Sequence, residues 1–304
     1  MENIRERLKT CTLLVFLVLL VCTLAACAKG PPPISHEDRV GIAVQYPGDK
    51  GIKSDRRVVF YENFEEGSLE EIIKRWGDAG KHPGNLSLSE ETAPMSAGRY
   101  ALKIKNNGHL YTHFEGIDTL FARYYVKFHK ETGYPSHLVN FIADRNTTPW
   151  PKGGAGRAPH GDQKFSVAID ACGLGGASGP PGIWCFYNYW HKMSGGWGNF
   201  FHDSFEQIEP GRWYCVEVMI KANSSPEKAD GELALWIDGE LKEHFRNFWW
   251  RTSNELKLNT IWLLYYVTES GMLRNKDYEM DKRTMEIWFD DIVIATKYIG
   301  PISR

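Results

Sequence analysis

Short segments in which apolar and polar residues alternate recur along most of the chain. Between Ala122 and His129 the even positions are apolar, whereas the odd positions carry Arg, Tyr, Lys and His. Successive side chains of a strand point to opposite faces of the sheet. This segment is therefore predicted to be a strand with one face on a core and the other on water or a ligand.

Two later segments repeat the pattern, from Tyr214 to Ile220 and from Leu233 to Ile237. The second ends at Asp238-Gly239, which is a strong hairpin signal. Further strands are expected at 163–170, 182–190, 260–268 and 285–295, and only Leu69 to Arg75 suggests a helix. Many short strands separated by turns are typical of an all-β antiparallel sandwich, and we expect one such domain over residues 55–304.

The first part of the chain has the order of segments found in an export signal. Arg5, Arg7 and Lys9 form a basic head, and Leu13 to Leu20 form an apolar run. That run is too short to cross a bilayer as a helix, which takes about 20 residues. We therefore expect a signal peptide over residues 1–26.

The signal ends in Leu24-Ala25-Ala26-Cys27, which resembles the lipobox of bacterial lipoproteins. The resemblance implies that Cys27 carries lipid and that the protein is anchored in the cell envelope, in the periplasm or on the cell surface. An ordinary signal peptide ending near Ala26 and a buried apolar helix are the alternatives. Residues 27–54 are rich in Pro, Gly and charge, which predicts a flexible linker.

Charge and cysteine content narrow the possible partners. The formal net charge is −2, so no basic excess points to nucleic acid. If Cys11, Cys22 and Cys27 belong to the signal and the lipid site, then Cys172, Cys185 and Cys215 remain. These three allow one internal disulfide. Cys172 and Cys185 flank a loop rich in Gly and Pro and could staple it, or all three thiols could be small buried hydrophobes.

Several motifs resemble those of concanavalin A-like jelly rolls in polysaccharide lyases. Near the C-terminus these are Trp288 to Ala295 and Tyr298-Ile299-Gly300-Pro301. The others are Gly211-Arg212-Trp213-Tyr214, Leu235 to Gly239 and Phe64-Glu65-Glu66-Gly67, so the resemblance covers Val58 to Pro301. Similar jelly rolls include lyases, glycoside hydrolases, lectins and non-catalytic carbohydrate modules. The resemblance therefore implies a jelly roll with a polysaccharide partner.

A lyase acting on a uronic-acid polymer has to remove the proton at C5, beside a carboxylate. It needs a group that neutralises this carboxylate, a base that takes the proton and an acid that protonates the leaving oxygen. Asn140 or His137 would be the neutraliser, with Arg123 as a further catalytic cation. The acid and base would be chosen from Tyr187, Tyr189 and Tyr265.

Substrate contacts are expected from Tyr125, Lys127, His191 and Trp236, because aromatic rings and cations suit an anionic sugar. Each candidate could instead have a purely structural role, since a tyrosine in a sandwich is more often a packing residue.

In similar carbohydrate modules a calcium ion is held by residues at the positions of Glu65 and Asp291. Calcium is the only cofactor expected, and Asp291 could equally just end a strand.

Three other functions were weighed against the lyase. Jelly-roll hydrolases of the laminarinase type carry Glu-x-Asp-x-x-Glu on one strand, and this pattern is absent from the sequence. A non-catalytic carbohydrate-binding lipoprotein would use the many tryptophans as stacking platforms. A structural surface lipoprotein would instead bury its aromatic residues under loops.

Overall fold

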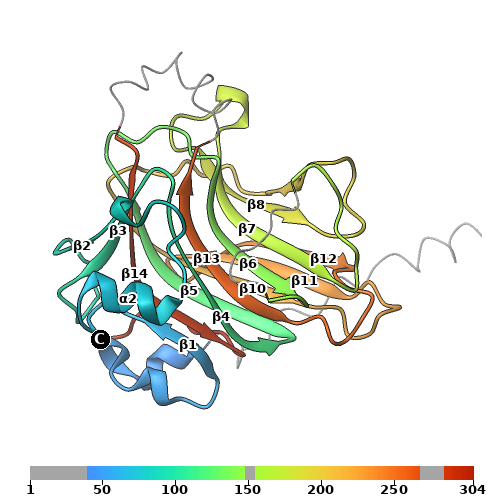
Figure 1. Ribbon diagram of the computed structural model, residues 1–304, viewed down its shortest axis with the longest axis horizontal. Helices are drawn as coiled ribbons and strands as arrows, with labels where there is room; N and C mark the ends of the chain where they lie inside the picture. Colours follow the sequence, from blue (N-terminus) through green and yellow to red (C-terminus); the bar gives the residue numbers. More distant parts are fainter. Residues whose placement is uncertain (1–39, 148–154, 268–283) are drawn as a thin grey trace, which may run out of the picture. The chain divides into compact units, whose positions relative to one another are not determined.

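Two antiparallel β-sheets stacked on one another form the folded part of the chain, so the predicted sandwich is confirmed (Figure 1). The computed structural model describes residues 40–147, 155–267 and 284–304. The predicted signal peptide, Cys27 and residues 27–39 of the predicted linker lie outside these residues. No helix within the described part of the chain is long and apolar enough to cross a membrane.

The first sheet has eight strands. Its order is β12-β11-β10-β5-β14-β3-β2, and β1 also pairs with β14. The strands are β1 (Val58–Glu62), β2 (Leu86–Ser89), β3 (Ala101–Lys105), β5 (Thr119–Phe128), β10 (Trp213–Lys221), β11 (Gly231–Ile237), β12 (Glu240–Phe248) and β14 (Glu286–Ala295).

The second sheet has six strands in the order β4-β13-β6-β7-β8-β9. They are β4 (Gly108–Ile117), β6 (His137–Asp144), β7 (Lys164–Cys172), β8 (Ile183–Tyr189), β9 (Asn199–Phe201) and β13 (Leu258–Tyr266). Because β6, β7 and β8 are neighbours both in sequence and in the sheet, residues far from the chain ends build its centre.

Helices are few and short. The helix expected at 69–75 is confirmed as α2 (Leu69–Trp76), which begins where the Ser68 hydroxyl accepts a hydrogen bond from the Glu71 N–H and ends at left-handed Gly77. The other helical turns are η2 (Ile42–Gln45), η3 (Pro47–Asp49), η4 (Ile52–Ser54), η5 (Pro83–Asn85) and η6 (Leu174–Gly176).

The core lies between the two sheets and follows the alternation in the sequence. Tyr124, Val126 and Phe128 of β5 belong to it, as predicted. Rings from opposite sheets meet there, for example Phe128 and Trp184, whose centroids are 6.0 Å apart. This apolar layer fixes which face of each strand points inward.

The outer face of the eight-stranded sheet is covered, contrary to the prediction that it faces water or a ligand. The helical turns within residues 40–54 pack there, with Ile42 and Ile52 in a cluster with Val293. Asp49, in the same segment, forms a buried ion pair with Arg123. Residues 40–54, predicted to belong to a flexible linker, are therefore packed on the sandwich by the apolar residues 42, 43 and 52 and by the ion pair of Asp49.

The end of the chain completes this cover. The Glu217 carboxylate of β10 accepts hydrogen bonds from the Ile299 N–H at 2.7 Å and the Gly300 N–H at 2.8 Å. The Tyr125 hydroxyl accepts one from the Ile302 N–H at 3.0 Å. Both termini of the folded unit thus lie on the same sheet face.

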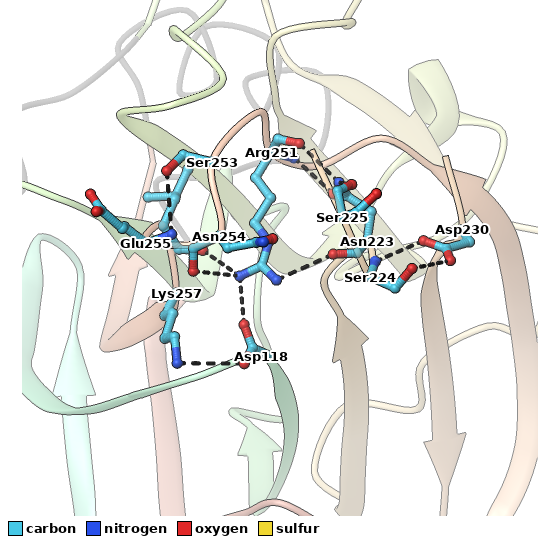
Figure 2. A network of polar contacts seen from close by, with 11 residues as sticks. Asp118, Asn223, Ser224, Ser225, Asp230, Arg251, Ser253, Asn254, Glu255 and Lys257 are labelled. Carbon is cyan, nitrogen blue, oxygen red and sulfur yellow. Dashed lines mark hydrogen bonds and ion pairs between the residues drawn. The ribbon is translucent and has the colours of Figure 1, made fainter. Parts of the chain in front are cut away.

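At one end of the sandwich, Arg251 ties together the connections that cross between the sheets (Figure 2). Its guanidinium donates to Asp118 Oδ1 at 2.6 Å and to the Leu256 carbonyl at 2.8 Å. Its backbone N–H donates to Asn223 Oδ1 at 2.9 Å. Since Asp118 joins β4 to β5 and Arg251 lies between β12 and β13, this network fixes two strands of the six-stranded sheet relative to the other sheet.

A disulfide joins Cys172 of β7 to Cys185 of β8, so the predicted staple is confirmed. It closes the loop 173–182 at its base. Cys215 is free and buried, and burial raises the pKa of its thiol to about 12.

Buried acids give the fold a testable pH dependence. Burial raises the pKa of Glu217 to about 7 from an ordinary 4.5. Between these two values the folded state holds a proton that the unfolded state has released, so this contribution to stability is full below about pH 4.5 and is lost as the pH rises to 7. The free energy of unfolding should fall by about 1.4 kcal/mol per pH unit for this group within the window.

Urea unfolding of the full chain from pH 5 to 8, in the presence of a metal chelator, measures this slope. Glu217→Gln should make the slope shallower without abolishing it, because burial also raises the pKa of Glu243 to about 7. Equal slopes for the two proteins would contradict the assignment.

Candidate active site

A cavity of about 860 Å³ opens on the outer face of the six-stranded sheet. Side chains from β4, β13, β6, β7 and β8 line it, together with residues from the connections before η5, between β3 and β4, between β6 and β7, and between β8 and β9. Those with polar or aromatic groups include Lys81, His82, Asn107, His109, His137, Asn140, Lys164, Ser166, Tyr187, Tyr189, Trp197, Trp262 and Tyr266.

Strand alternation explains why polar groups collect here. On β7, Phe165, Val167 and Ile169 belong to the core between the sheets, so Lys164 and Ser166 face the cavity. The same alternation on β8 points Phe186 into the core and points Tyr187 and Tyr189 to the cavity. Neighbouring strands lie about 5 Å apart, so these outward residues form one continuous surface.

Two tyrosines of β8 form a coupled pair of hydroxyls. The Tyr187 and Tyr189 oxygens are 3.1 Å apart. The Tyr187 hydroxyl also accepts a hydrogen bond from the Gly198 N–H at 3.1 Å, and Phe200 packs on its ring. Burial, followed by the bond to Tyr189, raises the pKa of Tyr187 well above its ordinary value. The hydroxyl therefore keeps its proton at neutral pH and can donate it.

His137 stands beside this pair. Its ring stacks on Tyr187 at 5.3 Å between centroids and on Tyr266 at 6.1 Å. Its Nδ1 lies 3.0 Å from Asp170 Oδ2. Burial alone would lower the pKa of His137, but the charge of Asp170 and the hydrogen bond to it raise the pKa above the ordinary value. A positive imidazolium is thus favoured in the cavity.

Lys164 adds an amine to the cavity, and its pKa is lowered, whereas that of His137 is raised. Burial lowers its pKa, and Asp144, whose Oδ2 lies 3.6 Å from Nζ, opposes this only in part. The neutral amine is therefore easier to reach than in a solvated lysine. Lys164 was not among the residues predicted from sequence, although its place on the polar face of the predicted strand 163–170 could have indicated it.

Asn140 lies in β6, opposite Trp262 of β13. It lines the cavity, and its buried Oδ1 has no hydrogen-bond partner among the described residues. Asn140, His137, Tyr187 and Tyr189, all predicted from sequence, are brought together. His109, Trp197, Trp262 and Tyr266 were not predicted, and the pairing of β4, β13 and β6 is what brings most of them to the site.

Tyr265 does not reach the cavity. It is fully buried in the core between the sheets, where its hydroxyl lies 2.7 Å from Thr132 Oγ1. Because successive residues of a strand point to opposite faces, Leu264 and Tyr266 of β13 face the cavity instead. The prediction of a catalytic role for Tyr265 is therefore corrected.

Four other predicted residues lie on the opposite sheet. Arg123 is completely buried in its ion pair with Asp49, and Tyr125 is buried under the C-terminal segment. Lys127 pairs with Glu91 and lies 4.4 Å from the ring centroid of Trp288. Trp236 packs on Phe121 and Tyr298. None of the four lines the cavity, which lies on the other sheet, so the prediction that they contact the substrate is corrected.

His191 and the two proposed calcium ligands also lie away from the cavity lining. His191 contacts the ring of Trp249 at 5.3 Å. Glu65 Oε1 accepts hydrogen bonds from the N–H groups of Arg99 and Tyr100, at 2.7 and 2.6 Å, and Asp291 is buried in β14. Within residues 40–147, 155–267 and 284–304, no three His, Cys, Asp or Glu side chains are grouped to hold a metal.

No protein-family model matches the sequence, and no curated protein matches it significantly. The fold is similar to solved structures of alginate lyases. The marine PL-14 alginate lyase of Aplysia kurodai is 14% identical with a TM-score of 0.58, over 79% of this chain and 99% of that chain. Alginate lyase Aly36B is 14% identical with a TM-score of 0.56, over 81% and 99%.

A third similar structure is the Chlorella virus alginate lyase vAL-1, which is 14% identical with a TM-score of 0.54, over 79% of this chain and all of that chain. At such identities the likeness concerns the fold. The resemblance to jelly-roll polysaccharide lyases inferred from sequence motifs is therefore confirmed as a resemblance of fold.

Proposed function

We propose that this protein is a polysaccharide lyase that cleaves a uronic-acid polymer by β-elimination. The observation that carries the proposal is the cavity itself. It gathers an amine with a lowered pKa, a pair of tyrosine hydroxyls and a histidine held by a carboxylate on one open sheet face. The fold neighbours that are alginate lyases support the same reaction class.

The first task is to stabilise charge on the uronate carboxylate when the C5 proton leaves. His137 as an imidazolium and the Asn140 side chain line the same cavity from β6. A cation and an amide placed against the carboxylate favour the enolate-like anion more than the ground state. We assign neutralisation to these two residues.

The second task is proton transfer. Neutral Lys164 takes the C5 proton on Nζ, and the electron pair of the C–H bond passes into the carboxylate group as the enolate-like anion. That pair then forms the C4–C5 double bond as the C4–O bond breaks, and Tyr187, whose hydroxyl lies 3.1 Å from that of Tyr189, gives its proton to the leaving oxygen. The products are one chain with a new hydroxyl end and one with a 4,5-unsaturated uronate.

One fold neighbour fits this choice of residues. Aly36B was crystallised with alginate tetrasaccharide as a double mutant in which a lysine and a tyrosine are replaced by alanine. That structure is 15% identical to this chain with a TM-score of 0.55. A lysine and a tyrosine are also the proton-transfer pair proposed here.

Non-catalytic carbohydrate binding is the second candidate, and Trp197 favours it. This residue lines the cavity with 66% of its surface exposed. Exposed rings stack on the apolar faces of sugars, and they do so in enzymes and in binding modules alike. Retention of a polysaccharide without formation of an unsaturated product would support this candidate.

Lys164→Ala and Tyr187→Phe should each lower kcat/KM on alginate or another uronate polymer by about a hundredfold or more, because each removes a proton-transfer group. The measurement is the ultraviolet absorbance of the unsaturated product. Lys221→Ala, a paired lysine on the other sheet, and Tyr265→Phe are the matched controls and should stay near wild-type activity.

Loss of activity in the controls, or full activity of Lys164→Ala, would contradict the assignment. Wild-type protein that yields no unsaturated product from any uronate polymer, yet is retained on a polysaccharide matrix, would replace the lyase by the binding function.

We also propose that the protein is a lipoprotein of the cell envelope with Cys27 as its lipid site. The order of basic head, apolar run and Leu-Ala-Ala-Cys supports this, and so does the disulfide, which suits an oxidising compartment. Cys27→Ser should move the protein from the membrane fraction to the soluble fraction. Protein that stays in the membrane fraction after this change would contradict lipidation at Cys27.

Calcium is proposed as a structural ion on the far side of the molecule. Asp291 Oδ2 is buried without a hydrogen-bond partner among the described residues. Burial raises the pKa of both Asp290 and Asp291. Repulsion from Asp291 adds to the shift of Asp290, repulsion from Asp49 adds to that of Asp291, and Glu65 repels both carboxylates. A divalent cation would relieve the repulsion, with backbone carbonyls completing the oxygen ligands.

Calcium at a hundred times its dissociation constant should stabilise the full chain by about 2.7 kcal/mol in urea unfolding, and a chelator should reverse this gain. Asp291→Asn should abolish the gain, whereas Asp230→Asn, an exposed acid paired with Ser224, should keep it. Equal stability with and without calcium would rule out the ion.

A further inference from the structure

Asp170 lies directly behind the proposed neutraliser and is itself inaccessible to a substrate. Only 2% of its surface is exposed. One carboxylate oxygen lies 3.0 Å from His137 Nδ1, and the other accepts a hydrogen bond from the Leu138 N–H at 2.9 Å. The carboxylate thus contacts both the ring of His137 and the backbone N–H of the next residue, Leu138.

These contacts determine which ring nitrogen of His137 remains free to bind a ligand. Nδ1 is engaged by Asp170, and Nε2 has no partner among the described residues. Tyr187 of β8 and Tyr266 of β13 stack on the ring and prevent it from turning. The remaining ionisable groups that line the same cavity are Lys81, His82, His109, Lys164 and Tyr189, and Asp170 is the acid in contact with the ring.

We propose that Asp170 is a positioning residue of the proposed lyase, and that it holds His137 as an imidazolium whose Nε2–H faces the substrate carboxylate. The inference rests on the proposed function and adds a substrate class to it. An imidazolium pairs with a free carboxylate and gains far less from a neutral ester or a hydroxymethyl group. The site should therefore require uronates with a free carboxylate and reject methyl-esterified or neutral chains.

Asp170→Asn tests this, because asparagine keeps the shape and a hydrogen bond but removes the charge. A carboxylate at this distance raises the pKa of a histidine, because it favours the charged imidazolium. At a pH below both histidine pKa values, the variant and the wild type both carry the imidazolium, so their kcat/KM should agree. As the pH rises, His137 loses its positive charge at a lower pH in the variant than in the wild type. In that pH range kcat/KM of the variant should be about tenfold or more below that of the wild type.

Two further variants separate this effect from damage to the fold. Asp170→Glu retains the charge and should restore the wild-type pH profile at least in part. Asp118→Asn removes an acid that pairs with Arg251 away from the cavity, and should leave the profile unchanged. A purely structural role of Asp170 would lower kcat/KM of Asp170→Asn by the same factor at every pH, and that result would overturn the inference.

A second measurement does not depend on activity. The ring protons of His137, assigned by their loss in His137→Gln, are titrated by NMR in the full-length wild type and in Asp170→Asn. A lower His137 pKa in the variant supports the inference, and an unchanged pKa overturns it. If the wild type forms no unsaturated product, the proposed function fails, whereas the NMR titration still decides the role of Asp170.

Discussion

The apolar layer between the two sheets is the interaction on which the candidate site depends. It holds Phe165, Val167 and Phe186 inward, and the two-residue period of a strand then leaves Lys164, Ser166 and Tyr187 no face but the outer one. A shift of one residue in the pairing of β7 would turn Phe165, Val167 and Ile169 outward and would bury the amine of Lys164. The chemistry of the cavity is therefore set by the same packing that stabilises the fold.

The two sheets use their outer faces differently. The eight-stranded sheet is sealed by the segment from residue 40 to 54 and by the last residues of the chain, with Arg123 and Glu217 buried beneath them. Charged and polar groups are costly to bury unless each has partners, and Asp49 and two backbone N–H groups supply them. Within residues 40–147, 155–267 and 284–304, no comparable segment covers the centre of the six-stranded sheet, where the polar groups line the cavity.

Much of the fold and part of the site were predictable from sequence because both follow from local alternation. His137, Asn140, Tyr187 and Tyr189 were found in this way. Arg123 has an equally clear alternating pattern, but the Asp49 segment that covers it is 74 residues away, and no local pattern reveals such a contact. Tyr265 and Tyr266 are adjacent, and only the register of β13 decides which one faces the core.

The disulfide between Cys172 and Cys185 joins the strands that carry Lys164, Asp170 and the tyrosine pair. Thiol exchange needs an accessible thiolate, and the third cysteine, Cys215, is buried in the other sheet. Once the domain has folded, the buried thiol of Cys215, the one free cysteine among the described residues, cannot attack the bond. A preparation made in a reducing cytosol would instead hold these two strands by hydrogen bonds and packing alone, and recombinant protein is therefore better produced by secretion into an oxidising compartment.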